Sequence, residues 1–202
     1  AVPASLATPR AALKWFAAAL RDGDAERLRQ VVLTTRPAEE RMIAGIADTA
    51  RALAGLHAAA SAAFGPDAAG RFADDAAADF DRTSARIDAA DVAVDADAAT
   101  VRYPEDKDHP YPLKRVGTTW MVPAAHFTGG ADPAALDRRL AELRVQTRIV
   151  ADLTAEIAAG RYKNADAAGQ AWRSKLMAAV GGGPDSKPAS RPATAPATRP
   201  AA

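Results

Sequence analysis

The chain has 202 residues, of which 55 are alanine, and its 26 basic residues nearly balance 25 acidic ones. This balance, with 20 arginines scattered along the chain, gives no basic surface to attract nucleic acid or anionic lipid, so no nucleic-acid partner is expected. The absence of cysteine excludes disulfides and thiolate chemistry, and no apolar run approaches the roughly 20 residues of a membrane span.

Two helices are predicted at the beginning of the chain. Thr8 suits the N-cap of a helix that begins at Pro9, and Gly23 is the expected end of this helix. Asp24 can then cap a short second helix. Residues 1–7 are mostly small, so we expect a flexible N-terminal segment there, similar to the sequence that follows a signal-peptidase cut.

A long helix is predicted to begin at Pro37, with acidic residues in its first turn that favour the positive end of the helix dipole. Its apolar stripe continues to Phe64, before the helix-breaking pair Gly65-Pro66. A further helical stretch is expected over 68–81, weakened by its aspartates.

The segment 85–127 is the only one with the two-residue period of β-strands. Strands are predicted over 87–94, 99–103, 113–116 and 119–122, with a polar loop over 104–110. A phase change near Ala89 suggests a bulge in the first strand. Four short strands cannot stand alone in water, so helices are expected to cover one face of this antiparallel sheet.

Two helices are predicted after the sheet. The first begins at Asp132-Pro133 and has a near-heptad apolar seam from Leu136 to Ile157. The second is capped by Asn164, and the two are expected to form an antiparallel hairpin. Residues 182–202 are rich in proline, alanine and threonine and lack large apolar side chains, which predicts a disordered tail.

Two patterns resemble the nuclear-transport-factor-2-like superfamily over residues 8–33 and 85–127. The first is a helix ending in Arg21-Asp22-Gly23-Asp24 before a short helix; the second is Val116-Gly117-Thr118-Thr119-Trp120-Met121-Val122. The resemblance implies a cone, in which N-terminal helices lie in a curved antiparallel sheet around a pocket. The helices expected over 37–64 and 133–180 depart from the family. Its members include isomerases, dehydratases, cyclases and non-catalytic binding modules, so the resemblance implies no single function.

The predicted fold class is therefore α+β, with N-terminal helices packed on a small curved sheet of about four strands, then a helical hairpin. The expected divisions are a flexible segment over 1–7, a cone-like domain over 8–130, a hairpin packed on it over 131–181, and the tail over 182–202. The first segment, the missing initiator methionine and the tail predict a secreted or periplasmic protein. A trimmed chain is the alternative, and a cytoplasmic location stays open.

His126 is the main candidate for catalysis, because it follows the last predicted strand near the expected mouth of the cone. With Asp88 or Asp91 and with Tyr103 nearby, its imidazole could shuttle a proton near neutral pH. The alternative, which we prefer, is a histidine hydrogen-bonded to backbone or solvent. Nucleotide-binding loops, dinucleotide fingerprints and metalloprotease motifs are absent from the sequence, so no cofactor and no metal site are predicted.

Trp15, Trp120 and Phe127 are the candidate ligand-binding residues, although such aromatic side chains more often belong to the core. The leading interpretation is an exported, non-catalytic protein that binds a small apolar ligand or a protein partner through its pocket or a helical face. One alternative is a small-molecule isomerase, dehydratase or cyclase that uses a His–Asp pair. Another is a helix-mediated assembly module, in which the seam over 136–157 meets a second copy in a homodimer.

Overall fold

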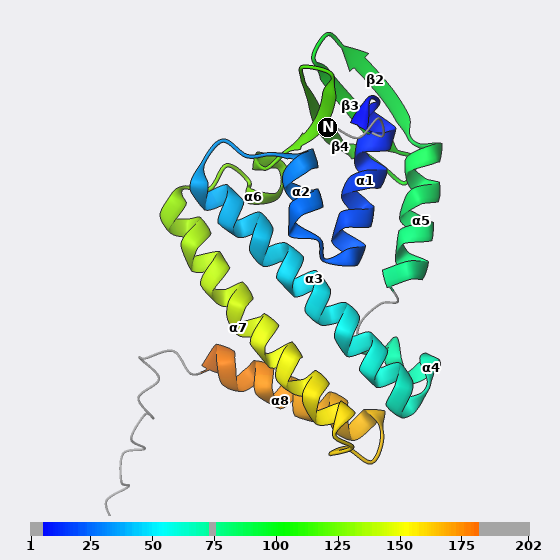
Figure 1. Cartoon of the computed structure of the whole chain (residues 1–202), viewed down its shortest axis with the longest axis vertical. Coiled ribbons are helices and arrows are strands. Elements are labelled where there is room, and N and C mark those ends of the chain that lie inside the picture. The colour runs from blue at the N-terminus through cyan, green and yellow to red at the C-terminus, as the bar shows by residue number, and fades with distance from the viewer. Residues whose placement is uncertain (1–5, 73–75, 182–202) are drawn as a thin grey trace, which may run out of the picture.

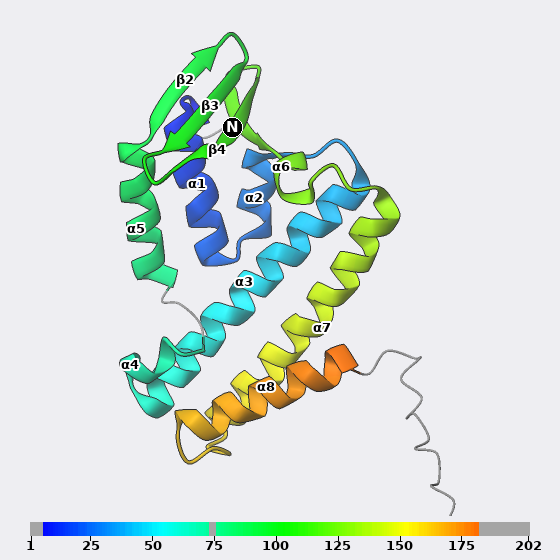
Figure 2. The same ribbon diagram turned by 180° about the vertical axis from the view of Figure 1, so that it is seen from behind.

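The structure, a computed structural model, describes residues 6–72 and 76–181 and has an α+β fold (Figure 1). The helices are α1 (Pro9–Asp22), α2 (Ala25–Val31), α3 (Pro37–Phe64), α4 (Pro66–Ala69), α5 (Ala76–Ala89), α6 (Ala125–Thr128), α7 (Pro133–Ala158) and α8 (Ala165–Gly181). The strands are β1 (Val32–Leu33), β2 (Asp91–Asp95), β3 (Ala98–Tyr103), β4 (Asp106–Val116) and β5 (Thr119–Pro123). The sheet lies at one end of the molecule beside α1, whereas α3 and α7 run side by side toward α4 and α8 at the other end (Figure 1, Figure 2).

Four predicted N-cap residues lie at the starts of helices. The side chain of Thr8 accepts a hydrogen bond from the backbone N–H of Ala11 at the start of α1. Asp24, Asp132 and Asn164 accept equivalent bonds at the starts of α2, α7 and α8. These side chains satisfy backbone N–H groups that have no partner within the helix, so the predicted starts of these helices are confirmed.

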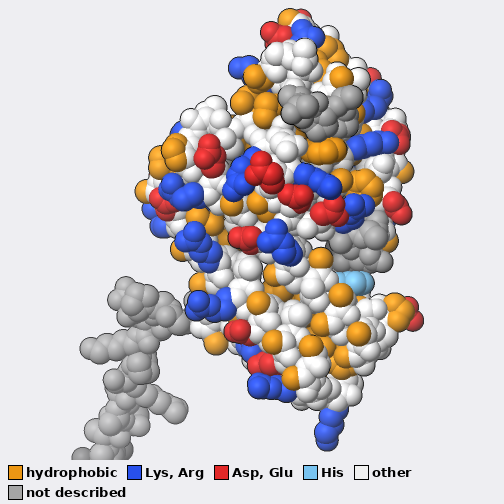
Figure 3. Space-filling view, viewed as in Figure 1, with side chains coloured by type: hydrophobic (Ala, Val, Ile, Leu, Met, Phe, Trp, Pro, Cys, Tyr) orange, Lys and Arg blue, Asp and Glu red, His pale blue; other side chains and the backbone are white. Residues whose placement is uncertain are grey.

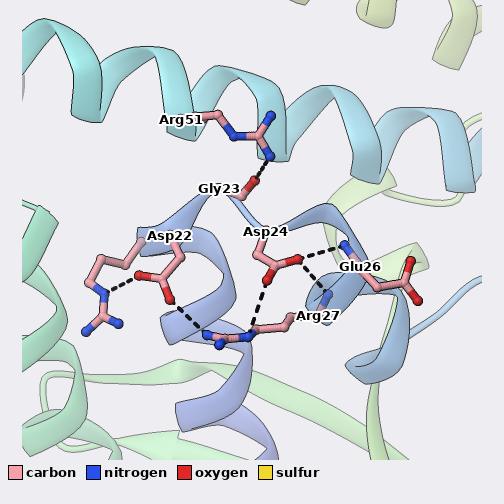
Figure 4. A network of polar contacts seen from close by, with 7 residues as sticks. Asp22, Gly23, Asp24, Glu26, Arg27 and Arg51 are labelled. Carbon is pink, nitrogen blue, oxygen red and sulfur yellow. Dashed lines mark hydrogen bonds and ion pairs between the residues drawn. The ribbon is translucent and has the colours of Figure 1, made fainter.

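The turn between α1 and α2 rests directly on α3. Gly23 has a left-handed φ of 59°, and its carbonyl accepts a hydrogen bond from the guanidinium of Arg51 on α3 (Figure 4). A Cβ atom at position 23 would lie 2.5 Å from the Cβ of Arg51. Beside this turn, Arg27 forms ion pairs with Asp22 at 2.9 Å and Asp24 at 3.3 Å. Glycine is therefore required for the backbone conformation and for the close approach of α3.

The sheet has the strand order β1-β5-β4-β3-β2. The β2–β3 and β4–β5 hairpins turn at Ala96-Asp97 and Gly117-Thr118, which lie between the predicted strands. The short strand β1 pairs in parallel with β5, with Val32 opposite Val122, and this strand was not predicted. The other neighbours are antiparallel.

The first predicted strand of the sheet begins later than expected. Ile87 does not begin a strand, because α5 continues to Ala89 and β2 begins only at Asp91. Ile87 lies at helical spacing from Phe80 and Thr83, and its burial on that helix face explains the error. The expected helical stretch over 68–81 falls partly in α4 and partly in α5, while residues 73–75 lie outside the described part of the chain.

Residues 104–110 do not form a loop. β4 begins at Asp106 and pairs with β3 across a turn at Pro104-Glu105. β5 pairs only with the last three residues of β4, so the earlier prolines Pro110 and Pro112 have one strand neighbour rather than two. Prolines are tolerated at such an edge because they need not donate a ladder hydrogen bond on its open side.

Two buried clusters share the helix α3. The first joins α1, α2, the sheet and the beginning of α3, where Ile43 and Ala47 are buried. The second joins α4, α7, α8 and the end of α3, where Leu56 and Ala60 are buried. Across the α3–α7 contact, the hydroxyls of Thr49 and Thr147 are hydrogen-bonded at 2.8 Å.

The apolar seam of α7 packs against other helices of this chain. Its buried members are Leu136, Leu140, Val150, Leu153 and Ile157. α7 packs along α3 and contacts α8, so these side chains face other helices of the same molecule (Figure 1, Figure 2). The predicted tail over 182–202 and residues 1–5 lie outside the described residues.

Candidate functional site

The candidate site is a pocket between α1, α3, α5 and strands β3 and β4. Its volume is about 620 Å³, and small-molecule sites are typically about 300–1,000 Å³. α1 and α5 lie side by side as two walls, the sheet lies at one end, and α3 lies at the other (Figure 1, Figure 2). The pocket therefore occupies the junction between the sheet-bearing end of the molecule and the long helices.

The middle of the pocket is apolar. Helix α1 contributes Leu13, Phe16 and Leu20, whose spacing of three and four residues places them on one helix face. Ile87 of α5 and Leu53 of α3 line the same space. This face of α1 thus belongs partly to the core and partly to the pocket wall.

The sheet end of the pocket is polar and aromatic. Tyr103 of β3 and Tyr111 of β4 line it, with their rings in an edge-to-face arrangement and centroids 6.5 Å apart. The guanidinium of Arg86 lies 5.0 Å from the centroid of the Tyr103 ring. Burial raises the pKa of both phenols, so they are neutral hydrogen-bond donors at physiological pH. Neither hydroxyl is hydrogen-bonded to another described residue.

The opposite end of the pocket contains charges that are already paired. Arg21 lies over the ring of Phe80 at 4.5 Å and forms an ion pair with Asp22 at 2.7 Å. Asp79, which also lines this end, accepts a hydrogen bond from Arg82. Each end therefore has a guanidinium with a carboxylate partner, Glu105 for Arg86 and Asp22 for Arg21, and the two phenol hydroxyls line the sheet end alone.

The three predicted catalytic residues occupy different surroundings. Tyr103 lines the pocket. His126 lies on α6 with its ring centroid 4.1 Å from that of Tyr111, and partial desolvation lowers its pKa. Asp88 is exposed at the end of α5 and is paired with Lys14 of α1 at 2.7 Å. Within the described residues, no hydrogen bond joins His126 to Asp88 or Asp91. Tyr111 is the residue that links His126 to Tyr103, through ring contacts alone.

The three predicted ligand-binding aromatic residues lie around the pocket rather than in its lining. Trp120 is buried in the core, with Arg115 over its ring. Trp15 lies beneath the guanidinium of Arg27, and its buried Nε1 has no hydrogen-bond partner among the described residues. Phe127 stacks on Phe16, which does line the pocket, at a centroid distance of 5.1 Å.

Sequence reasoning missed the two residues that give the sheet end its chemistry. Tyr111 follows the segment assigned to a polar loop, so its place on β4 was not expected. Arg86 was placed before a strand, whereas the helical spacing of Phe80, Thr83 and Ile87 could have placed it on α5 beside the pocket.

Within the described residues, His, Asp and Glu side chains form no group of three or more that could hold a metal ion. The helices of this same part of the chain include none with both the length and the apolar composition of a membrane span.

Comparison of the chain with protein-family models, with curated proteins and with solved structures finds no match.

Proposed function

We propose that this protein binds one small, mainly apolar molecule in the pocket between α1, α3, α5 and the sheet, without catalysing a reaction on it. The observation that supports this most directly is the pocket itself. Large apolar side chains such as Leu13, Phe16 and Leu53 surround a space of about 620 Å³. Small-molecule sites are typically concave, mainly apolar spaces of this size, and this supports a ligand in the pocket.

Binding is favoured over acid–base catalysis by the surroundings of the candidate residues. Among the described residues, His126 meets Tyr111 and Phe127 rather than a carboxylate. Asp88 is held by Lys14 at the surface. A histidine general base needs a substrate proton within hydrogen-bond reach, and His126 does not line the pocket.

A pocket ligand is also favoured over partner binding through the α7 seam. Leu140 and Leu153 are buried, at 4% and 0% exposed, so both parts of this seam are already covered by the chain's own helices. The nuclear-transport-factor-2-like resemblance fits this proposal, because it implies a pocket bounded by N-terminal helices and an antiparallel sheet.

The proposal is tested with Nile red, a neutral apolar dye whose fluorescence rises in apolar surroundings. Ala54 lines the pocket from α3, so Ala54→Phe places a ring in the ligand space. We expect this variant to bind the dye at least about tenfold more weakly than the wild type, equivalent to about 1.4 kcal/mol. Ala58→Phe is the matched control, because Ala58 is exposed one turn further along the same helix.

Circular dichroism of both variants checks that the helices are retained. Equal dye affinity in the wild type, Ala54→Phe and Ala58→Phe would show that the dye binds elsewhere. A wild-type protein that binds neither the dye nor any other apolar probe would contradict the proposed function.

A further inference from the structure

The geometry points to an apolar carboxylate as the ligand: we infer that Arg86, Tyr103 and Tyr111 bind its carboxylate at the sheet end, while its hydrocarbon body lies between α1 and α5. This inference rests on the proposed function, because it names the class of molecule for the same pocket. The following contacts support it.

The sheet end offers hydrogen-bond donors that have no acceptor among the described residues. Arg86 donates its Nε to Glu105, an exposed residue outside the pocket lining, and its two terminal nitrogens have no hydrogen-bond partner among the described residues. The hydroxyls of Tyr103 and Tyr111 are also without hydrogen-bond partners there. A guanidinium and two neutral phenols can together donate to both oxygens of a carboxylate.

The stacking of Arg86 on Tyr103 holds the cation in place. The guanidinium carbon is 5.0 Å from the ring centroid, and the bond from Nε to Glu105 restrains the group further. The tyrosine rings are restrained in turn by their edge-to-face contact at 6.5 Å. A donor set that is held before the ligand arrives loses less conformational entropy on binding.

The orientation of the ligand follows from the charges at the two ends. Asp79 lines the end near Phe80, and a ligand carboxylate there would meet a like charge. Both guanidiniums already have a carboxylate partner, Asp22 at 2.7 Å for Arg21 and Glu105 for Arg86, so the ends differ in the two phenol hydroxyls that only the sheet end offers. The carboxylate therefore belongs at the sheet end, and the apolar tail extends past Leu13 and Leu20 toward Phe80 and Phe72.

The test compares two probes of the same length, decanoate and decanol, in displacing Nile red from the wild-type protein at pH 7.5. We expect decanoate to bind about tenfold more tightly than decanol, because hydrogen bonds to a charged group are stronger than those to a neutral hydroxyl. In Arg86→Gln, decanoate affinity should fall about tenfold, while decanol affinity should change less than about twofold.

Matched controls come from outside the pocket. Arg115 lies 5.5 Å from the centroid of the Trp120 ring and is paired with Asp97, so Arg115→Gln removes the same kinds of contact without touching the pocket lining. Should Arg86→Gln fail to fold, Tyr103→Phe and Tyr111→Phe provide the test. Each should weaken decanoate binding about three- to tenfold. Tyr162→Phe is their control, because the Tyr162 hydroxyl bonds to Glu156 away from the pocket.

The possible results separate the two proposals. If Nile red and decanol bind but decanoate binds no more tightly than decanol, the carboxylate inference is wrong and the apolar pocket stands. Equal loss of both probes in Arg86→Gln would also overturn the inference, since the residue would then support the pocket walls only. If the wild-type protein binds none of the three molecules, the proposed function fails as well.

Discussion

The guanidinium of Arg86 lies over the ring of Tyr103, and this contact joins the end of α5 to strand β3. It depends on α5 remaining helical as far as Ala89, because the helix brings Arg86 to the pocket on the same side as Thr83 and Ile87. The sheet and the helix therefore build the polar end of the pocket together, and neither element could form it alone.

The turn between α1 and α2 gives a first prediction. Gly23→Ala should lower the free energy of unfolding by about 2–4 kcal/mol, because a left-handed φ costs a side-chain-bearing residue about 1–2 kcal/mol and the new Cβ would also clash with Arg51. Gly117→Ala is the control: its φ is 61°, and no atom lies within 4 Å of the new Cβ. It should cost only about 1–2 kcal/mol. Urea unfolding measures both, and equal losses would show that the contact with α3 is unimportant.

The interior of α3 gives a second prediction, of opposite sign. Gly55 is exposed, and a Cβ there would meet nothing within 4 Å. Gly55→Ala should therefore raise the free energy of unfolding by about 0.5–1 kcal/mol through helix propensity. At Gly45 the same Cβ would lie 2.5 Å from the Cδ1 of Leu140, so Gly45→Ala should lose that gain. Chemical unfolding of Gly55→Ala and Gly45→Ala measures the free energy of unfolding of each variant. Stabilisation of equal size at both positions would contradict the close packing of α3 on α7.

Glu39 gives a prediction about pH. This carboxylate is 2% exposed; burial would raise its pKa, but hydrogen bonds from Thr35 and Arg36 outweigh burial and lower the pKa overall. A lowered pKa in the folded state means that the carboxylate stabilises the fold above its unfolded pKa of about 4.3, and that this stabilisation is lost as pH falls through the folded value.

Glu39→Gln should therefore cost about 1–3 kcal/mol at pH 7. Its difference from the wild type should shrink as the pH falls below about 4. Glu26→Gln, at an exposed ion pair with Arg29, should change stability by less than about 1 kcal/mol at either pH. Urea unfolding at several pH values makes the comparison, and a pH-independent deficit in Glu39→Gln would refute the role of the ionised carboxylate.

Much of the helical framework could be predicted from sequence because its signals are local. Thr8, Asp24, Asp132 and Asn164 each cap a helix within three residues of themselves, and these starts are confirmed. The sheet was predicted less well. β1 has two residues and exists because Val32 meets Val122, a pairing that no local pattern indicates.

The candidate site was predicted least well, for the same reason. Tyr103 was identified, but Arg86 and Tyr111 reach the pocket only through the true end of α5 and the true start of β4. Trp120 was a candidate pocket residue with the core as its alternative, and at 4% exposed it lies in the core. A pocket built from three helices and two strands depends on long-range packing, which the residue pattern of one segment does not contain.

The most direct test of the account is methyl NMR of the protein during titration with decanoate. Ligand binding in the proposed pocket should shift the methyl signals of Leu13, Leu20, Leu53 and Ile87, which line it. The methyl signals of Leu153 and Ile157, buried in the second cluster, should stay in place. Shifts confined to the second cluster, or no shifts at saturating decanoate and decanol, would contradict a binding pocket between α1, α3, α5 and the sheet.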